Sequence, residues 1–345
     1  MSTSKKQGLL ERLKVGPVLC AEGYIFELER RGYVQAGAYV PEVVLEHPEV
    51  VVQLHKEFIR AGTDVVPALT YYGHREKLKV IGREDDLEWL NRQAVRLAHA
   101  AVGDADILVA GNICNTWAYK PDDPVAHAEV RRQYTEQVQW AVEEGIDFVI
   151  AETLEYVGEA LIALEVIKHF SLPAVINFAP IYARSKDGYD WIKACQILAE
   201  AGADVVGFNC ARGPNTLLPL VRRLAKTITQ IPTAAIPVPY RTNAARPAIE
   251  FLKQRNGATA YATGLDRYLI DRHDAAQFTQ NALAEGVRFI GLCCGAGPQH
   301  IRAVAEALGK HPEASRFSAD FSRHGLLGND QIVKPHEKAF IKLWK

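Results

Sequence analysis

The chain has 345 residues, of which 48% are hydrophobic, and 40 basic residues face 41 acidic ones for a net charge of −1. This balance leaves no basic stripe for nucleic acid or an anionic membrane, and no apolar run approaches the ~18 residues of a membrane span. The six cysteines are unevenly spaced and the start is polar, so we expect a reducing, cytoplasmic location rather than a disulfide framework or a signal peptide.

One local pattern recurs along the chain. An amphipathic helical segment ends in a glycine, and a short apolar run begins two residues later, at residues 61–65, 144–148, 201–205 and 285–289. Glycine at a helix C-terminus adopts the left-handed backbone at little steric cost, and a strand that is buried on both faces is apolar throughout. The pattern therefore predicts helix-to-strand crossovers of a parallel sheet.

Short apolar runs of this kind read as buried strands, and helical segments separate most of them. In chain order they are residues 18–20, 65–69, 107–110, 148–151, 174–178, 205–208, 235–238 and 289–292. Eight strand–helix repeats predict a closed (β/α)8 barrel, the TIM barrel, over residues 1–310. The rival is an open doubly wound sheet, but no G-x-G-x-x-G follows the first strand. Pro67 and Pro237 fall inside runs and are unfavourable in a central strand.

The barrel pattern stops after residue 310. Residues 311–345 form a short C-terminal extension whose last part is amphipathic and contains Trp344. An apolar tail needs a covering surface, which is either the outside of its own barrel or a second subunit. The second alternative predicts a homo-oligomer, and the sequence favours neither.

Sulfur atoms follow two of the predicted strands. Cys210 ends the run at 205–208, and Cys293 and Cys294 end the run at 289–292. Active sites of such barrels lie where the strands end, and a glycine turn after Cys294 allows two adjacent cysteines to face one ion. Zinc favours thiolates in a tetrahedron, and a catalytic site leaves one position open. We therefore predict a Zn2+ site that activates a substrate thiol.

The alternative for any free cysteine is a buried, small apolar side chain. We assign this packing interpretation to Cys20, Cys114 and Cys195, each of which stands alone. Glu152 and Glu155 follow the fourth run, so they belong to the same predicted mouth.

Three motifs resemble those of the homocysteine S-methyltransferase family. They are Gly-Phe-Asn-Cys at 207–210, Gly-Leu-Cys-Cys-Gly at 291–295 and Pro-Gln-His-Ile-Arg at 298–302. Further segments are most similar to the betaine–homocysteine branch, so the likeness covers nearly the whole chain: 8–13, 28–33, 46–49 and 54–62. The resemblance implies zinc on the three cysteines and transfer of a methyl group from an onium donor to homocysteine, giving methionine.

The resemblance also implies substrate contacts. Tyr72, after the second strand, would occupy the open zinc position when substrate is absent, and Asn209 and Gly23 would line the substrate pocket. Glu152 and Glu155 are candidates for holding the substrate ammonium group. A quaternary ammonium donor favours an aromatic box, and the candidates for that box are Tyr39, Tyr71, Tyr72, Trp117 and Tyr156.

Two departures from the family pattern keep the substrates open. Where the family's first strand ends in Asp-Gly-Gly, this chain has Ala21-Glu22-Gly23, so either Glu22 takes over the ammonium contact or the acceptor is another thiol. Tyr39 stands where betaine enzymes carry tryptophan, so S-methylmethionine and other sulfonium donors remain alternatives to betaine. A zinc-containing barrel that binds a betaine-like ligand without catalysis is the alternative from another class.

Overall fold

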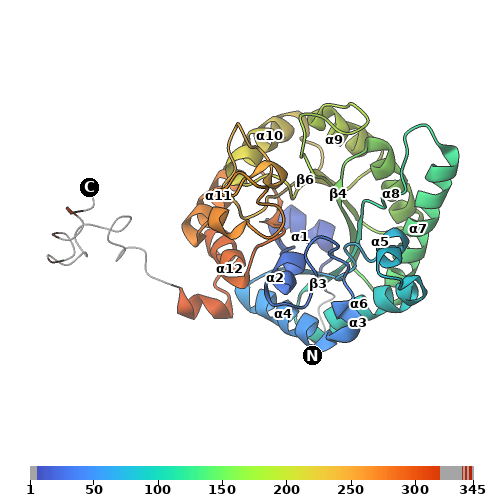
Figure 1. The fold of residues 1–345 in the computed structure, drawn as a ribbon, viewed down its shortest axis with the longest axis horizontal. Coiled ribbons are helices and arrows are strands. Elements are labelled where there is room, and N and C mark those ends of the chain that lie inside the picture. The colour runs from blue at the N-terminus through green and yellow to red at the C-terminus, as the bar shows by residue number, and fades with distance from the viewer. Residues whose placement is uncertain (1–5, 319–335, 337–338, 340–341, 344–345) are drawn as a thin grey trace.

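The computed structural model describes residues 6–318 together with 336, 339, 342 and 343. Within this part of the chain eight parallel strands close into a barrel in the order β1 to β8, and helices surround it (Figure 1). Because β1 pairs with both β2 and β8, the sheet has no edge. The predicted (β/α)8 barrel is confirmed, whereas the predicted C-terminal extension lies mostly outside the described residues.

Each predicted apolar run falls on one barrel strand. The strands are β1 Val18–Ala21, β2 Val65–Pro67, β3 Leu108–Cys114, β4 Phe148–Leu154, β5 Ala174–Phe178, β6 Val205–Asn209, β7 Thr233–Ile236 and β8 Phe289–Leu292. Apart from half-buried Thr153, every strand residue is buried, as expected for strands covered on both faces. Pro67 is the last residue of β2 and Pro237 follows β7, so neither proline interrupts a strand.

Long helices form the outer ring, and shorter ones fill the loops. The long ones are α4 Pro48–Ala61, α6 Leu87–Val102, α7 Pro124–Glu143, α8 Val157–His169, α9 Trp191–Glu200, α10 Pro214–Thr227, α11 Arg272–Ala284 and α12 Pro298–Ala307. The short ones are α1 Leu9–Val15, α2 Tyr24–Arg30, α3 Val43–Glu46, α5 Arg75–Val80, η1 Glu84–Asp86, η2 Ile249–Phe251, η3 Asp266–Tyr268 and η4 Glu313–Phe317. Gly62, Gly145, Gly202 and Gly286 all have positive φ, which confirms the helix-ending pattern.

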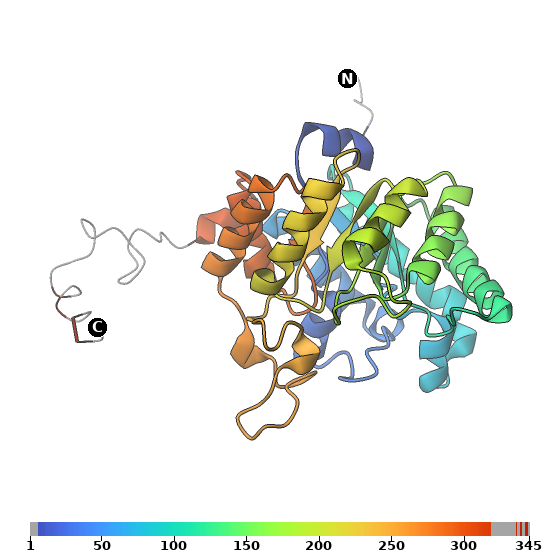
Figure 2. The same cartoon turned by 90° about the horizontal axis from the view of Figure 1, so that it is seen from above.

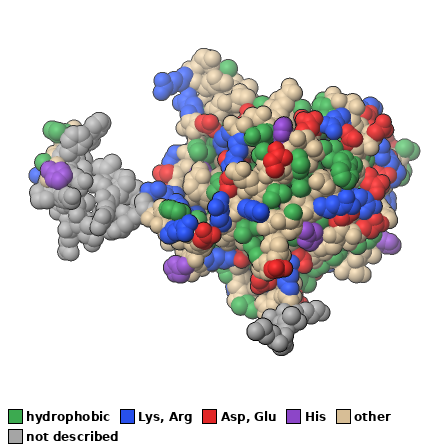
Figure 3. Space-filling view, turned by 90° about the horizontal axis from the view of Figure 1, so that it is seen from below, with side chains coloured by type: hydrophobic (Ala, Val, Ile, Leu, Met, Phe, Trp, Pro, Cys, Tyr) green, Lys and Arg blue, Asp and Glu red, His purple; other side chains and the backbone are tan. Residues whose placement is uncertain are grey.

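The two ends of the barrel are built differently. Figure 2 shows α1 at one end and the segment between β7 and α11, which holds η2 and η3, projecting from the opposite end. The latter is the end at which the strands finish, where barrel enzymes place their chemistry. On the face drawn in Figure 3, basic and acidic side chains stand beside one another. None of the described helices is long and apolar enough to cross a membrane.

A buried histidine on α4, which faces a tyrosine of α2, links the stability of the fold to pH. His55 is fully buried, its Nδ1 lies 2.9 Å from the Tyr24 hydroxyl, and its Nε2 has no partner. Burial lowers the pKa of His55 to about 3. An unfolded histidine titrates near pH ~6.5, so below that pH the unfolded chain binds a proton that the folded chain does not.

We therefore expect His55 to lower the free energy of unfolding by about 1.4 kcal/mol per pH unit as the pH falls from 6.5 toward 4. Urea unfolding at pH 6.5, 5.5 and 4.5 measures this slope. In a His55→Gln variant the slope should be smaller by the contribution of one proton, about 1.4 kcal/mol per pH unit. The slope should be unchanged in His47→Gln, which alters an exposed position. An unchanged slope in His55→Gln would mean that this histidine is not the linked group.

Candidate metal centre and substrate pocket

Three sulfur atoms meet at the open end of the barrel. The Sγ atoms of Cys210, Cys293 and Cys294 all lie within 4.8 Å of one another, and those of Cys293 and Cys294 are 3.7 Å apart. Thiolates bound to one tetrahedral zinc ion at ~2.3 Å are separated by about 3.8 Å. The structure thus brings together the three cysteines predicted as ligands, at a spacing that fits one ion.

Irregular backbone after the strands β6 and β8 orients these sulfur atoms. The strand β8 ends at Leu292, so Cys293 and Cys294 both lie in the turn that follows, and the main-chain N–H of Cys293 donates to the Pro237 carbonyl at 2.9 Å. Gly295 continues the turn with a φ of 95°, and Arg30 donates to the Gly295 carbonyl at 2.9 Å. Cys210 itself has a φ of 55°. A left-handed backbone at a residue other than glycine is strained, and such positions gather at functional sites.

Hydrogen bonds between the three thiols shift their pKa values. Hydrogen bonds from Cys293 and then Cys294 hold the pKa of Cys210 well below its usual range. Burial raises the pKa of Cys293, and the neighbouring Cys210 raises that of Cys294. The Cys210 thiol therefore loses its proton more readily than a free thiol. Ionisation of Cys293 or Cys294 is opposed by burial and by the charge already on Cys210. A divalent cation among the sulfurs would offset that charge, so the donor set fits zinc.

A pair of carboxyl groups lies beside the sulfurs. Glu22, directly after β1, and Glu152, on β4, have oxygens within 4.8 Å of each other and of the Cys293 sulfur. Both side chains are buried, at 7% and 4% exposure. Burial raises the pKa of Glu152 to about 7 and raises that of Glu22 well above its usual value. The second oxygen of Glu22 has no hydrogen-bond partner, so it can receive an ammonium group.

Two amides orient Glu152. Asn112, on β3, donates to one oxygen of Glu152, and Asn209, on β6, donates to the other at 2.6 Å. The Asn209 amide nitrogen is also 3.8 Å from the Cys293 sulfur. Asn209 therefore connects the carboxyl pair to the cysteine cluster, and the substrate contact predicted for it stays a prediction.

Gly23 lies where two turns approach one another closely. A Cβ atom at this position would lie 2.0 Å from the Ala296 carbonyl oxygen, in the turn before α12. Its φ of −77° is ordinary for any residue, so the requirement for glycine is steric. This packing requires glycine at position 23, and the substrate contact that the resemblance implied stays a prediction.

The cavity between the carboxyl pair and the vicinal cysteines is small. Its volume is about 20 Å3, and Glu22, Glu152, Tyr71, Cys293 and Cys294 are among the residues that line it. A space of this size holds roughly one water molecule. An amino-acid thiol therefore requires that a lining side chain move, and Tyr71 lies in the loop after β2 rather than in a strand.

The predicted aromatic candidates divide into groups. Tyr71 and Tyr72 have ring centroids 4.3 Å apart, and Tyr72 meets Trp117 edge-to-face at 5.7 Å. Burial raises the pKa of the Tyr72 hydroxyl, and Cys114, Cys210 and Cys294 raise it further. Tyr39 instead stacks on Phe26 at 5.0 Å.

Two further candidates lie apart from these groups. Tyr156 packs against Tyr119 with ring centroids 5.1 Å apart. Glu155 forms an ion pair with Lys186 at 3.0 Å, so its charge already has a partner. The structure thus associates Glu152, but not Glu155, with the cysteine cluster.

No sequence pattern pointed to three other residues at this mouth. They are Lys77, whose ammonium group lies against the Tyr72 and Trp117 rings, Asn112, and Glu250 on η2. Burial and then Cys210 raise the pKa of Glu250 to about 8, and its Oε2 has no partner. A lysine on a short helix or a glutamate in a long loop carries no recognisable sequence signal. Both are brought to the mouth of the barrel by long-range folding rather than by a local pattern.

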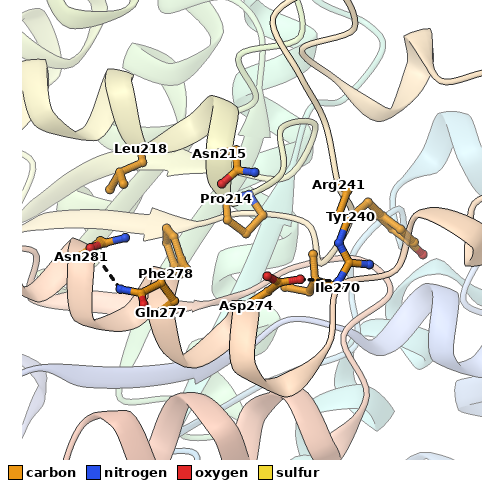
Figure 4. A pocket seen from close by; sticks show the side chains of 10 residues that line it. All are labelled: Pro214, Asn215, Leu218, Tyr240, Arg241, Ile270, Asp274, Gln277, Phe278 and Asn281. Carbon is orange, nitrogen blue, oxygen red and sulfur yellow. Dashed lines mark hydrogen bonds and ion pairs between the residues drawn. The ribbon is translucent and has the colours of Figure 1, made fainter. Parts of the chain in front are cut away.

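A separate cavity of about 90 Å3 lies between α10 and α11 (Figure 4). Its principal charges, Arg241 and Asp274, form an ion pair with each other, and Gln277 bonds to Asn281. No cysteine lines it. Its polar groups are largely satisfied, and we assign it no chemistry.

Two comparisons of the sequence with known proteins lead to the same family. The family model described as homocysteine S-methyltransferase matches residues 23–308. An S-methylmethionine–homocysteine S-methyltransferase, BHMT2 of Pongo abelii, is 34% identical over 344 residues, covering 97% of this chain and 90% of the relative. Betaine–homocysteine S-methyltransferase 1 of Xenopus tropicalis is 32% identical, covering 99% and 84%. The metallated form of the homocysteine methyltransferase MmuM of Escherichia coli has a TM-score of 0.66 at 20% identity, covering 85% and 97% of the chains, and shows the fold.

Proposed function

The chain belongs to the homocysteine S-methyltransferase family, and on this premise we propose that it is a zinc-dependent enzyme that moves a methyl group from an onium donor to the sulfur of homocysteine, forming methionine. The observation that carries the proposal is the meeting of three sulfurs within 4.8 Å at the mouth of the barrel. A fourth, incoming sulfur completes the tetrahedron that three thiolates leave open.

Cys210, Cys293 and Cys294 are the residues that would hold the ion. A thiol with a pKa of ~8.5 is mostly protonated near neutral pH, and bound zinc keeps it as the nucleophilic thiolate. The buried position of all three cysteines excludes bulk water from the reacting sulfur. In such a place, cancellation of charge between a thiolate and a cationic methyl donor is favoured over separated ions.

The carboxyl pair suits the other end of the acceptor. Glu22 and Glu152 would take the ammonium group of homocysteine, with Asn112 and Asn209 fixing the orientation of Glu152. These contacts hold the sulfur in line with the methyl carbon, and alignment of this kind supplies much of the rate in a transfer between two bound molecules. Tyr72 would close the open ligand position between turnovers.

The donor is the less constrained partner. Tyr71, which lines the cavity beside Cys293 and Cys294, offers its ring to a sulfonium or a quaternary ammonium centre, whereas the Tyr72 and Trp117 rings already hold the Lys77 ammonium group. The relatives named above include enzymes of both donor types at similar identity, 34% and 32%. We therefore propose an onium donor of the betaine or S-methylmethionine kind.

Two wider properties belong to the same proposal. All six cysteines are free, which is typical of a reducing compartment and supports a cytoplasmic location. The extension after residue 310 would join barrels into a homo-oligomer through its apolar tail.

An assay of the purified protein tests the function. Homocysteine is supplied with glycine betaine, S-methylmethionine or dimethylsulfoniopropionate in turn, and methionine is measured together with the zinc content. We expect methionine from at least one donor and about one zinc per chain. Binding of donors without methionine, in protein that holds its zinc, would instead favour the non-catalytic binding barrel.

A further inference from the structure

A buried ammonium group already lies in the aromatic cluster. The Nζ atom of Lys77, on α5, is 3.8 Å from the centroid of the Tyr72 ring and 3.8 Å from that of Trp117. The two rings meet at 74°, so the ammonium group occupies the corner between them. Lys77 is only 2% exposed, whereas Trp117 is 58% exposed. The buried ammonium group therefore lies beside a tryptophan that reaches the surface.

The hydrogen-bonding capacity of this ammonium group is incompletely used. It donates to the Ala38 carbonyl at 2.8 Å, and an ammonium group has three donors. Burial lowers the pKa of Lys77 to about 8, the Cys114 sulfur partly offsets this shift, and no carboxylate contributes to it. Within residues 6–318 no ion pair of Lys77 is found. A desolvated positive charge without a counterion favours binding of an anionic group.

Tyr72 and its neighbour Tyr71 connect this corner to the cavity beside the vicinal cysteines. Tyr72 forms one wall, and its main-chain N–H donates to the Cys114 sulfur at 3.3 Å, beside Tyr71. Tyr71 in turn lines the small cavity that holds Cys293 and Cys294. A donor lying along Tyr72 would extend from Lys77 toward that cavity.

We infer that Lys77, with Tyr72 and Trp117, forms a carboxylate subsite for the methyl donor. The donor would be a zwitterion whose carboxylate pairs with Lys77 while its onium centre faces the sulfurs. A cation without a carboxylate would meet the fixed charge of Lys77 and be rejected, so the same residue discriminates by attraction and by repulsion. This inference rests on the proposed function.

A purely structural function for Lys77 is the rival explanation, because its bond to Ala38 ties α5 to the loop before α3. Matched ligands separate the two. Glycine betaine and tetramethylammonium share a trimethylammonium centre and differ in the carboxylate. Dimethylsulfoniopropionate and ethyldimethylsulfonium form the corresponding sulfonium pair. Loss of a structural bond would weaken both members of a pair alike.

The experiment measures the dissociation constant of all four compounds by calorimetry, and methyl transfer where it occurs, for the wild type, Lys77→Met, Lys77→Arg and Lys79→Met. Lys79 lies on the same helix and is exposed. We expect the wild type to prefer the carboxylate-bearing member of at least one pair by about tenfold or more, as one charge-assisted hydrogen bond provides. Lys77→Met should bring that ratio near one, Lys77→Arg should retain part of it, and Lys79→Met should leave it unchanged.

The inference is overturned if the wild type binds both members of each pair equally, or if Lys77→Met keeps the wild-type ratio. Should Lys77→Met fail to fold, the wild-type ratio and its change in Lys77→Arg decide the matter. Methyl transfer by the wild type with an unchanged ratio in Lys77→Met refutes the subsite alone. Selective carboxylate-dependent binding without transfer from any donor refutes the proposed function and leaves the subsite.

Discussion

Replacement of Cys294 by alanine is expected to remove the metal and with it the activity. Three thiolates are needed to hold the ion with one position open, and two buried sulfurs leave the coordination incomplete. Zinc content should fall from about one per chain to near zero. Loss of residues that merely support ligands reduces affinity or activity about 10- to 100-fold, so loss of a ligand should reduce methyl transfer by more than ~100-fold. Elemental analysis and the methionine assay measure the two effects.

Cys195→Ala is the matched control for this prediction. Cys195 is also buried, on α9, where it belongs to the hydrophobic core, and its sulfur donates a weak hydrogen bond to the Gly207 carbonyl at 4.0 Å. Its removal leaves a similar small void, so both variants should lose comparable stability. Zinc and activity should persist in Cys195→Ala. Full zinc occupancy in Cys294→Ala would exclude Cys294 from the ligand set.

The barrel could be predicted because its signals are local. Strands buried on both faces are apolar, and a glycine with a left-handed backbone follows several of the helices. Each strand–helix repeat can therefore be recognised from a few neighbouring residues. The convergence of Cys210 with Cys293 and Cys294 followed from the barrel, since all strand ends share one mouth. The approach of the three sulfurs to within 4.8 Å of one another depends on the left-handed backbone at Cys210 and on the turn at Gly295, which the sequence does not specify.

The substrate pocket was harder to predict because its residues gain their meaning from long-range contacts. Glu152 and Glu155 look alike in the sequence, yet one is oriented by two asparagines and the other is paired with Lys186. Lys77 lies within the short helix α5, and only the folded chain puts its ammonium group between two rings. Local patterns report which side chains are buried, but not which buried charges lack a partner.

The departure from the family pattern at the first strand has a structural explanation. The family's aspartate position is occupied by Ala21, which is the last residue of β1 and fully buried. Glu22, one residue later, lies outside the regular strand, and its longer side chain brings an oxygen within 4.8 Å of Glu152. A carboxylate therefore remains in the pocket although the position has shifted, which favours an acceptor that carries an ammonium group.

Glu152→Gln should accordingly impair recognition of the amino group while leaving the metal in place. Replacing a charged partner of a buried ammonium group by a neutral one removes roughly 2–3 kcal/mol, so kcat/KM for homocysteine should fall about 30- to 150-fold. The same substitution should hardly affect 4-mercaptobutyrate, which keeps the thiol and the carboxylate but lacks the amino group. Glu155→Gln is the control, since Glu155 is paired with Lys186. An equal loss for both thiols would point to a defect at the metal centre instead.

Substitutions at Glu22 test which thiol is the natural acceptor. If Glu22 has taken over the family's ammonium contact, Glu22→Gly should lose homocysteine selectivity as Glu152→Gln does, because the unpartnered oxygen of Glu22 is the acceptor that the ammonium group needs. Adding Ala21→Asp to Glu22→Gly should restore it, since this double variant recreates the Asp-Gly-Gly order with Gly23. Use of homocysteine by the double variant but not by the natural chain would have the opposite meaning. In that case the carboxyl pair would close the amino-acid pocket, and the natural acceptor would be a thiol of another kind.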